Sequence, residues 1–208
     1  VAPLPHMKPL ILIDIFCWGF SFLIMSLSLR ASDPPNIVII MADDMGACDL
    51  GAYGNADAET PHLDRLAAES IRHEAFYVTP VCAPTRAELL TGRKHLRVGV
   101  SQVHGGKDHI QLDETLLPEY LKSVDYATGT WGKWHSGTSE GYLPHQRGFD
   151  ETLLLQLYRH RDPIGTTHCG EKIRFDGRWG EEVIVDHALD FAERHRDRCG
   201  GTTVLLGQ

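Results

Sequence analysis

The sequence contains no run of lysine or arginine. Its 208 residues include 20 Lys and Arg against 28 Asp and Glu, which gives a formal net charge of −8. Proteins that bind nucleic acid need a clustered basic face to contact the phosphates, so this composition argues against nucleic acid as the main partner. The chain also lacks an internal repeat, and its length suits one ordinary domain with a sizeable core.

Cysteine is scarce as well. One of the five cysteines lies in an apolar N-terminal segment, and four follow it: Cys48, Cys82, Cys169 and Cys199. Four cysteines could form two disulfides, but only three remain if Cys82 has another role, so the sequence predicts no disulfide framework. The dipeptide His168-Cys169 has no second Cys or His at zinc-ligand spacing, which argues against a zinc site.

The first thirty residues form a separate segment. Met7 and Lys8 precede an uncharged apolar run over residues 15–29, IFCWGFSFLIMSLSL. This pattern favours a secretory signal. A membrane anchor is the alternative, but a span needs ~20 apolar residues and Asp14 interrupts this one. The sequence therefore predicts a signal peptide or hydrophobic segment over residues 1–32, a globular domain over 33–208, and export to the periplasm or the cell exterior.

Strand and helix signals alternate after this segment. The run NIVIIM, residues 36–41, is continuous, apolar and rich in β-branched residues, as in a strand buried on both faces of a parallel sheet. Residues 60–71 carry a Thr-Pro helix start and an apolar stripe, which predicts a crossover helix. A helix over 115–122, a buried strand over 126–131, an amphipathic helix over 181–198 and a strand from 202 follow.

This alternation predicts an α/β domain with a mainly parallel sheet flanked by helices. Residues 96–109 and 135–150 are predicted as long loops over the sheet edge. The last strand, with the sequence TTVLL, is expected at the outer edge of the sheet, where an uncovered apolar strand would invite aggregation.

Polar residues follow two of the predicted strands. Asp43 and Asp44 follow the first, and Lys133 and His135 follow the second. In an open parallel sheet, ligands bind beyond the carboxyl ends of the strands. Two adjacent carboxylates repel each other, so keeping both ionised at one site favours a hard cation such as Ca²⁺ or Mg²⁺; a solvated turn is the alternative. Lys133 and His135, two residues apart on an extended segment, would project from the same side.

The stretch VCAPTRAELLTGR, residues 81–93, predicts a helix that begins near a thiol. Pro84 suits a first helical turn, and Cys82 and Arg86 are four residues apart, so both can lie on one face at the helix N-terminus. That end of a helix favours an anion. Cys82 there could act as a nucleophile, and a half-buried structural cysteine is the alternative.

The stretch PVCAPTRAELLTG, residues 80–92, resembles the active-site signature of the sulfatase family, which is C-x-P-x-R followed by a hydrophobic pair, Thr and Gly. Five further blocks resemble the family in the same order: PNIVIIMADDMG, DLGAYGN, TPHLDRLA, YATGTWGKWH and RGFDE. The resemblance covers roughly residues 35–200, and a match of so many blocks in order is far more specific than any single motif. Asp125 and Trp131 depart from the pattern, which usually has Gly at the first position and a smaller residue at the second.

The resemblance implies an alkaline-phosphatase-like sulfatase fold and hydrolysis of sulfate esters, either aryl sulfates or carbohydrate sulfates such as those of a polysaccharide. It implies that the formylglycine-generating machinery oxidises Cys82 to formylglycine during export, and that a hydroxyl of the hydrated aldehyde attacks the sulfur. By matching position, Arg86 would stabilise the hydrated aldehyde, and Lys133 would bind both this diol and the sulfate. His135 would deprotonate the second hydroxyl, so that sulfate is expelled and the aldehyde forms again.

The resemblance also implies a metal, Ca²⁺ or alternatively Mg²⁺, bound by Asp43, Asp44 and the modified Cys82. The family supplies a second Asp/Asn pair, a second His and a second Lys further downstream, and no segment after His135 matches them. We therefore expect a catalytic domain that is incomplete at its C-terminus, with little turnover of its own. A catalytically inactive remnant that binds anions or glycans is the alternative; the C-x-P-x-R context disfavours a phosphatase. The sequence leaves the oligomeric state open.

Overall fold

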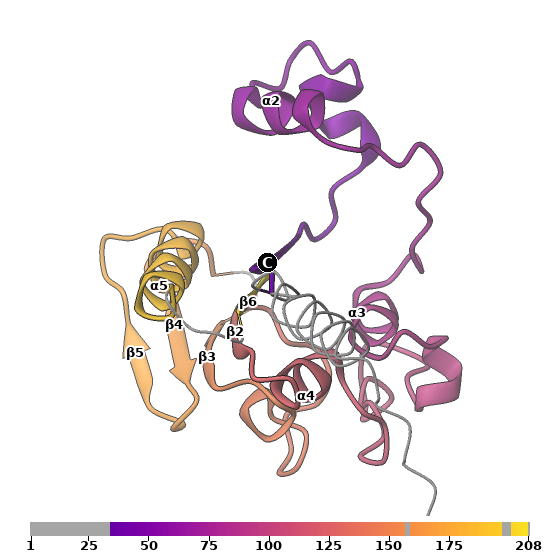
Figure 1. The fold of residues 1–208 in the computed structure, drawn as a ribbon, viewed down its shortest axis with the longest axis vertical. Coiled ribbons are helices and arrows are strands. Elements are labelled where there is room, and N and C mark those ends of the chain that lie inside the picture. The colour runs from indigo at the N-terminus through magenta and orange to yellow at the C-terminus, as the bar shows by residue number, and fades with distance from the viewer. Residues whose placement is uncertain (1–33, 157–158, 197–200, 208) are drawn as a thin grey trace, which may run out of the picture. The chain divides into compact units, whose positions relative to one another are not determined.

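The structure is a computed structural model that describes residues 34–156, 159–196 and 201–207. Figure 1 shows these residues in colour. The segment predicted as a signal or hydrophobic segment, residues 1–32, lies outside the described residues, and so does Cys199. Among the described residues, no helix is both long and apolar enough to span a bilayer.

A mixed six-stranded sheet forms the centre of the fold. Its strand order is β1-β6-β2-β3-β4-β5. The strands are β1 (Ile37–Met41), β2 (Ala127–Gly132), β3 (Glu151–Leu155), β4 (Ile164–Thr167), β5 (Lys172–Arg174) and β6 (Thr202–Gly207). The first four strands in this order run parallel, β4 is antiparallel to β3, and β5 is antiparallel to β4. The prediction of a mainly parallel α/β sheet is confirmed, and the short strands β3 to β5 had no clear sequence signal.

The last strand lies inside the sheet. β6 pairs with β1 on one side and with β2 on the other, both in parallel. The prediction that TTVLL forms the outer edge is therefore wrong, and β1 is the edge strand instead. An inserted strand gains hydrogen bonds along both of its sides, and this position also shields its apolar sequence from edge-to-edge pairing.

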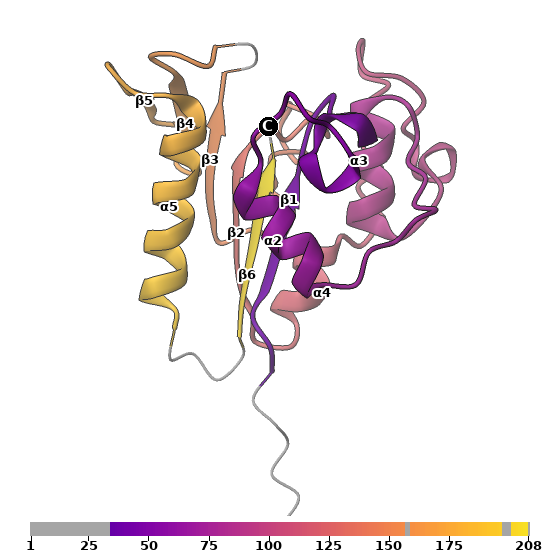
Figure 2. The same ribbon diagram turned by 90° about the horizontal axis from the view of Figure 1, so that it is seen from above.

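Helices cover both faces of the sheet (Figure 2). Helices α3 (Cys82–Thr91) and α4 (Leu117–Lys122) lie on one face, and α5 (Gly180–Arg194) lies on the other. The amphipathic pattern of α5 is confirmed, because its buried positions recur at helical spacing and pack on β2 and β3: Val183, Ile184, Ala188 and Phe191. On the opposite face, a second cluster joins α3 and Leu116, the residue before α4, to Trp134 and Phe149.

Two of the expected burials do not occur. Val38 and Ile40 of β1 are 60% and 71% exposed, because α5 covers β2 and β3 and leaves this face of β1 bare among the described residues. Helix α2 (Pro61–Glu69) forms as predicted but has no buried residue. The start of α2 is hydrogen-bonded to the preceding turn, because Asp64 Oδ1 accepts the Ala52 N–H at 2.7 Å. Helix α2 thus lies in the crossover connection between the parallel strands β1 and β2, as predicted, but its apolar stripe is not buried.

The structure explains the two departures from the sulfatase pattern. Asp125 has a φ of 67°, in the left-handed region that favours glycine and tolerates Asp. Trp131 is 1% exposed, and its ring packs edge-on against Phe191 of α5, with 5.1 Å between the ring centroids.

Asp150 joins the start of β3 to β2. Its Oδ2 accepts the Thr128 N–H at 3.0 Å and the Thr128 hydroxyl at 3.1 Å, and its Oδ1 forms an ion pair with Lys122. Burial alone would raise the pKa of this carboxyl, but the bonds from Lys122 and Thr128 outweigh it and lower the pKa below its ordinary value of 3.8. The carboxylate form is therefore the one that the fold favours.

We expect Asp150→Asn to lower the free energy of unfolding by about 1.5 kcal/mol at neutral pH, since hydrogen bonds to a charged group are lost. A depressed pKa in the folded state stabilises the protein above the unfolded value and ceases to do so as the pH falls through the folded value. The difference between wild type and variant should thus vanish well below pH 3.8. Urea unfolding at both pH values measures it, and an equal difference at both would contradict the assignment.

Candidate active site

The ends of β1 and β2 bring the predicted polar residues together. Met41 of β1 and Gly132 of β2 are both in register with Gly207 of β6, so the two strands end at the same level of the sheet. Lys133 directly follows the end of β2, and Asp43 follows the end of β1 after Ala42. Their side chains meet across β6, with 2.6 Å between Lys133 Nζ and Asp43 Oδ2.

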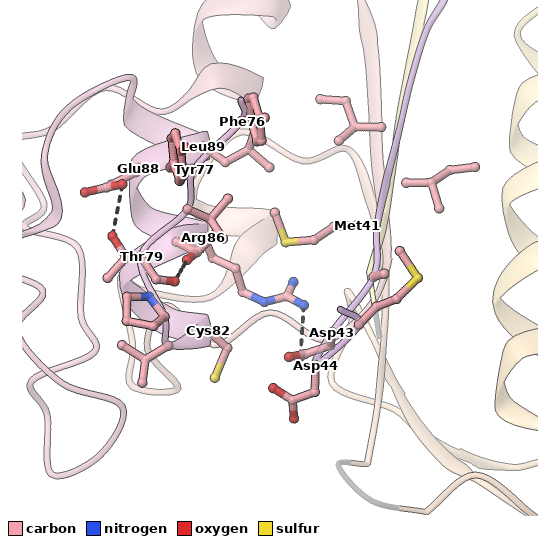
Figure 3. A pocket seen from close by; sticks show the side chains of 18 residues that line it. Met41, Asp43, Asp44, Phe76, Tyr77, Thr79, Cys82, Arg86, Glu88 and Leu89 are labelled. Atoms are coloured by element: carbon pink, nitrogen blue, oxygen red, sulfur yellow. Dashed lines mark hydrogen bonds and ion pairs between the residues drawn. The ribbon is translucent and has the colours of Figure 1, made fainter. Parts of the chain in front are cut away.

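Helix α3 supplies the thiol and the guanidinium from the other side. Cys82 is its first residue, and Arg86 lies one turn later on the same face, as predicted. Arg86 is 5% exposed; its Nη1 donates to the Lys133 carbonyl at 2.8 Å, and its Nη2 lies 3.4 Å from Asp43 Oδ2. Figure 3 shows the guanidinium directed at Asp43. Leu90 anchors the helix in the core.

The carboxylate of Asp43 is thus shared by two cations. Burial alone would raise the pKa of Asp43, but the hydrogen bond and charge of Lys133, followed by the charge of Arg86, lower it. For Lys133, burial alone would lower the pKa, and the bonds to Asp43 and Cys82 raise it. Asp43 is therefore ionised and Lys133 is protonated at neutral pH.

Cys82 faces an imidazole. Its Sγ lies 3.2 Å from Nδ1 of His135, and Nε2 of the same ring lies 2.9 Å from the carbonyl oxygen of Val103. His135 has a φ of 57°, so the extended segment after β2 ends there, yet Lys133 and His135 both reach the site as predicted. Sequence reasoning missed Val103, because its backbone carbonyl, which any residue carries, makes the contact.

Two cavities meet at Cys82. One of about 630 Å³ is lined by Asp43, Asp44 and Arg86, and also by the apolar side chains of Phe76 and Tyr77 (Figure 3). The other, of about 390 Å³, has a more polar wall that includes His104, Asp108, His109, His135 and Thr138. In the sequence, His135 and the long loops predicted over residues 96–109 and 135–150 pointed to this second wall.

Asp44 differs from its neighbour. It is exposed and has a φ of 58°, whereas the Asp43 carboxylate is engaged by Lys133 and Arg86. Two carboxylates are the right donors for a hard cation, but such cations want six to eight oxygen ligands. No group of three or more His, Cys, Asp or Glu in the described part of the chain could hold a metal. The donor chemistry fits a hard cation, and the ligand number is incomplete.

The arrangement can act on an anion. An ammonium, a guanidinium and the N-terminus of α3 place positive charge around Cys82, and a proton acceptor lies beside it. Such a site stabilises negative charge that develops on oxygen atoms and removes a proton from a group at position 82.

Comparison with known proteins shows what this chain is similar to. It is 35% identical over 197 residues to N-acetylgalactosamine-6-sulfatase of Sus scrofa, covering 80% of this chain and 37% of that protein. It is 41% identical over 156 residues to arylsulfatase A of Bos taurus, covering 71% and 30%. The structure of BT4656 in complex with its substrate, D-glucosamine-2-N,6-O-disulfate, matches with a TM-score of 0.71 and 27% identity, covering 83% of this chain and 34% of that one.

The chain spans about a third of the length of these relatives. A sulfatase family model matches residues 35–198, which contain both strand ends and the whole of α3. This match covers most of the chain and all six residues predicted for the site, and on this basis the chain belongs to the sulfatase family.

Proposed function

We propose that this chain is the N-terminal catalytic part of an enzyme that hydrolyses sulfate esters, with Cys82 as the residue converted to formylglycine. The contact of 3.2 Å between Cys82 Sγ and His135 Nδ1, beside Lys133, carries the proposal. In a purely structural cysteine, neither a base nor a cation would be needed at the sulfur. Both are needed where position 82 carries a nucleophile that acts on an anion.

Formylglycine at position 82 would supply a hydrated aldehyde, one hydroxyl of which is the nucleophile toward sulfur. The surroundings of the thiol suit such a group, because Cys82 lines both cavities and has a proton acceptor within hydrogen-bond distance. As the attacking hydroxyl bonds to sulfur, the S–O bond of the ester would break and the alcohol would leave. His135 would then accept the proton of the second hydroxyl through Nδ1, so that sulfate leaves and the aldehyde forms again. Lys133 and Arg86 would stabilise the negative charge of the sulfate, assisted by the N–H groups at the start of α3.

Asp43 and Asp44 are proposed as part of the ligand set of a divalent cation, preferably Ca²⁺, with Mg²⁺ as the alternative, and the group at position 82 would join them. Carboxylate oxygens suit both ions. When bound, the cation would add positive charge beside the sulfate. The remaining ligands would come from outside the described residues, so the reaction steps above rest on the chain's own side chains.

The substrate is proposed to be a sulfate ester of a sugar or a phenol. The polar cavity beside His135 suits sugar hydroxyls, and the cavity lined by Phe76 and Tyr77 suits an aromatic ring. The names of the relatives include both a sugar sulfatase and an arylsulfatase. Export of the chain, with oxidation of Cys82 by the formylglycine-generating machinery during export, is part of the same proposal.

The second candidate is an inactive remnant that binds anions or glycans. One observation favours it: Asp43 is already engaged by Lys133 and Arg86, and the described residues lack a complete metal site. Such a protein would keep the positive surroundings of Cys82 and bind sulfate without turning an ester over.

We expect the peptide that contains Cys82 to carry formylglycine when the chain is made in a cell with the modifying machinery. Mass spectrometry of that peptide is the measurement. Turnover of an aryl sulfate is then compared in two proteins: this chain alone, and a chimera in which residues 34–207 replace the matching segment of arylsulfatase A. Hydrolysis by the chimera, lost in its Cys82→Ala variant, is the expected result. A modified chimera that binds sulfate without hydrolysing the ester would favour the remnant instead.

A further inference from the structure

Both ring nitrogens of His135 have a partner. Nδ1 lies 3.2 Å from Cys82 Sγ, and Nε2 lies 2.9 Å from the backbone carbonyl oxygen of Val103. A neutral imidazole carries one N–H, and a carbonyl oxygen only accepts hydrogen bonds. The proton therefore belongs on Nε2, which leaves the lone pair of Nδ1 facing Cys82. The opposite tautomer would set the lone pair of Nε2 against the carbonyl oxygen.

A tight turn holds the Val103 carbonyl in this place. The Val103 side chain packs against the core cluster beside α3, and the next four residues, His104 to Lys107, reverse the chain. The Lys107 N–H donates to the His104 carbonyl at 3.3 Å. Gly105 and Gly106 have φ values of 68° and 75°, the positive values that the central residues of a type I′ turn require.

The far end of the same loop, at His109, packs beside the segment that carries His135. The ring of His109 stacks on Tyr142, with 4.6 Å between the centroids. At Gly137, two residues after His135, a Cβ would lie 2.6 Å from Tyr142 Cβ and 3.0 Å from His109 Cδ2. This close approach fixes the loop against the segment that carries His135, so the carbonyl and the imidazole keep their relative position.

We propose that the His104–Lys107 turn is a positioning element of the active site, which fixes His135 in the Nε2-protonated tautomer through the Val103 carbonyl. The inference rests on the proposed function, in which Nδ1 accepts a proton from the group at position 82. A neighbour that fixes one ring nitrogen decides which of the two is available as the base. The turn residues do not need to touch the reacting atoms.

The test measures the tautomer itself. In the 208-residue chain with ¹⁵N-labelled histidine, long-range ¹H–¹⁵N correlation at a pH where imidazole is neutral distinguishes the two nitrogens, and His135→Gln identifies the signal. We expect wild type to show the Nε2-protonated form alone. Gly105→Val, which forces a β-branched residue to a positive φ, should give a mixture of both forms. Gly105→Asn should keep the wild-type form, because Asn-Gly is a favoured type I′ pair.

Gly170→Val is the matched control. Gly170 also has a positive φ, 79°, no atom lies within 4 Å of the place that a Cβ would occupy, and the residue belongs to the turn between β4 and β5. This variant should lose a similar amount of thermal stability and keep the wild-type tautomer. An Nδ1-protonated His135 in wild type overturns the proposal, even where Gly105→Val does not fold. A folded Gly105→Val with the wild-type tautomer overturns it as well.

The rate gives a second readout. In the chimera with formylglycine, kcat of Gly105→Val should fall in proportion to the lost Nε2-protonated fraction, with KM unchanged. If the chimera hydrolyses no sulfate ester while the tautomers behave as expected, the proposed function fails and the positioning by the turn stands. The two failures are therefore distinguishable.

Discussion

Replacing His135 by alanine is expected to lower the hydrolysis of an aryl sulfate by about 10²–10⁴-fold, the usual contribution of a general acid or base. Nδ1 of His135 is 3.2 Å from Cys82 Sγ, and the other ring nitrogen of His135 is engaged by Val103, so the substitution removes the proton acceptor that faces position 82. The loss should appear in kcat, because Lys133 and Arg86, the cations proposed to bind the sulfate, remain in place.

The measurement is kcat and KM of the chimera at equal formylglycine content, which mass spectrometry verifies. His168→Ala serves as the control, since His168 is exposed in the turn between β4 and β5. A His135→Ala protein that turns over as fast as this control would rule out His135 as the base. A variant that lost formylglycine would point to a role in modification instead.

The elements that carry the site could be predicted from the sequence because each has a strong local signal. Pro84 in the first turn and Gly92 after the last residue mark both ends of α3, and Gly92 indeed has a φ of 66°. The strand β2 is buried along its whole length, as its composition indicated. Polar residues at the end of a buried strand have no place in a core, which is why Asp43 and Lys133 stood out.

Neither the segments that pack on the sheet nor the order of its strands could be predicted in the same way. The stripe on α2 shows that Leu63 and Leu66 share a face, but not what lies against that face, and both are exposed. The position of β6 depends on which neighbours it pairs with, and TTVLL is equally compatible with an edge and an interior. Both errors concern contacts between segments that are far apart in the sequence, and the periodicity of a single segment does not determine such contacts.

The contacts between residues within the site could not be predicted from the sequence either. That Asp43 bonds to Lys133 follows from the register of β1 and β2 with Gly207 of β6, a strand more than sixty residues further along the chain. The Val103 carbonyl reaches His135 only because a Gly-Gly turn folds back over it. The sequence predicted side chains that the fold brings together at this site, and the topology decides which partner each one contacts.

Asp43→Asn and Asp44→Asn are expected to differ sharply in stability, although each removes one adjacent charge. Asp43 sits between Lys133 and Arg86, whose side chains are 10% and 6% exposed. Removing one partner of a buried pair leaves the other charge uncompensated, which costs about 3–5 kcal/mol. Because the Asp43 side chain is 15% exposed, the lower end of that range, about 3 kcal/mol, is expected. Asp44→Asn at an exposed site should change stability by less than about 0.5 kcal/mol, and asparagine also tolerates its positive φ.

Calcium separates the structural role of Asp43 from the metal-binding role proposed for both residues. A cation that binds only the folded protein raises the melting temperature by mass action, so millimolar Ca²⁺ should stabilise wild type. The effect should be weak, because hard cations want six to eight oxygens and only two carboxylates are at hand. Asp44→Asn should keep the metal-free melting temperature of wild type and lose the response to calcium. Asp43→Asn should have a lower metal-free melting temperature and should also lose the response to calcium. Thermal unfolding with Ca²⁺ and with a chelator measures this, and a full calcium response in Asp44→Asn would remove Asp44 from the ligand set.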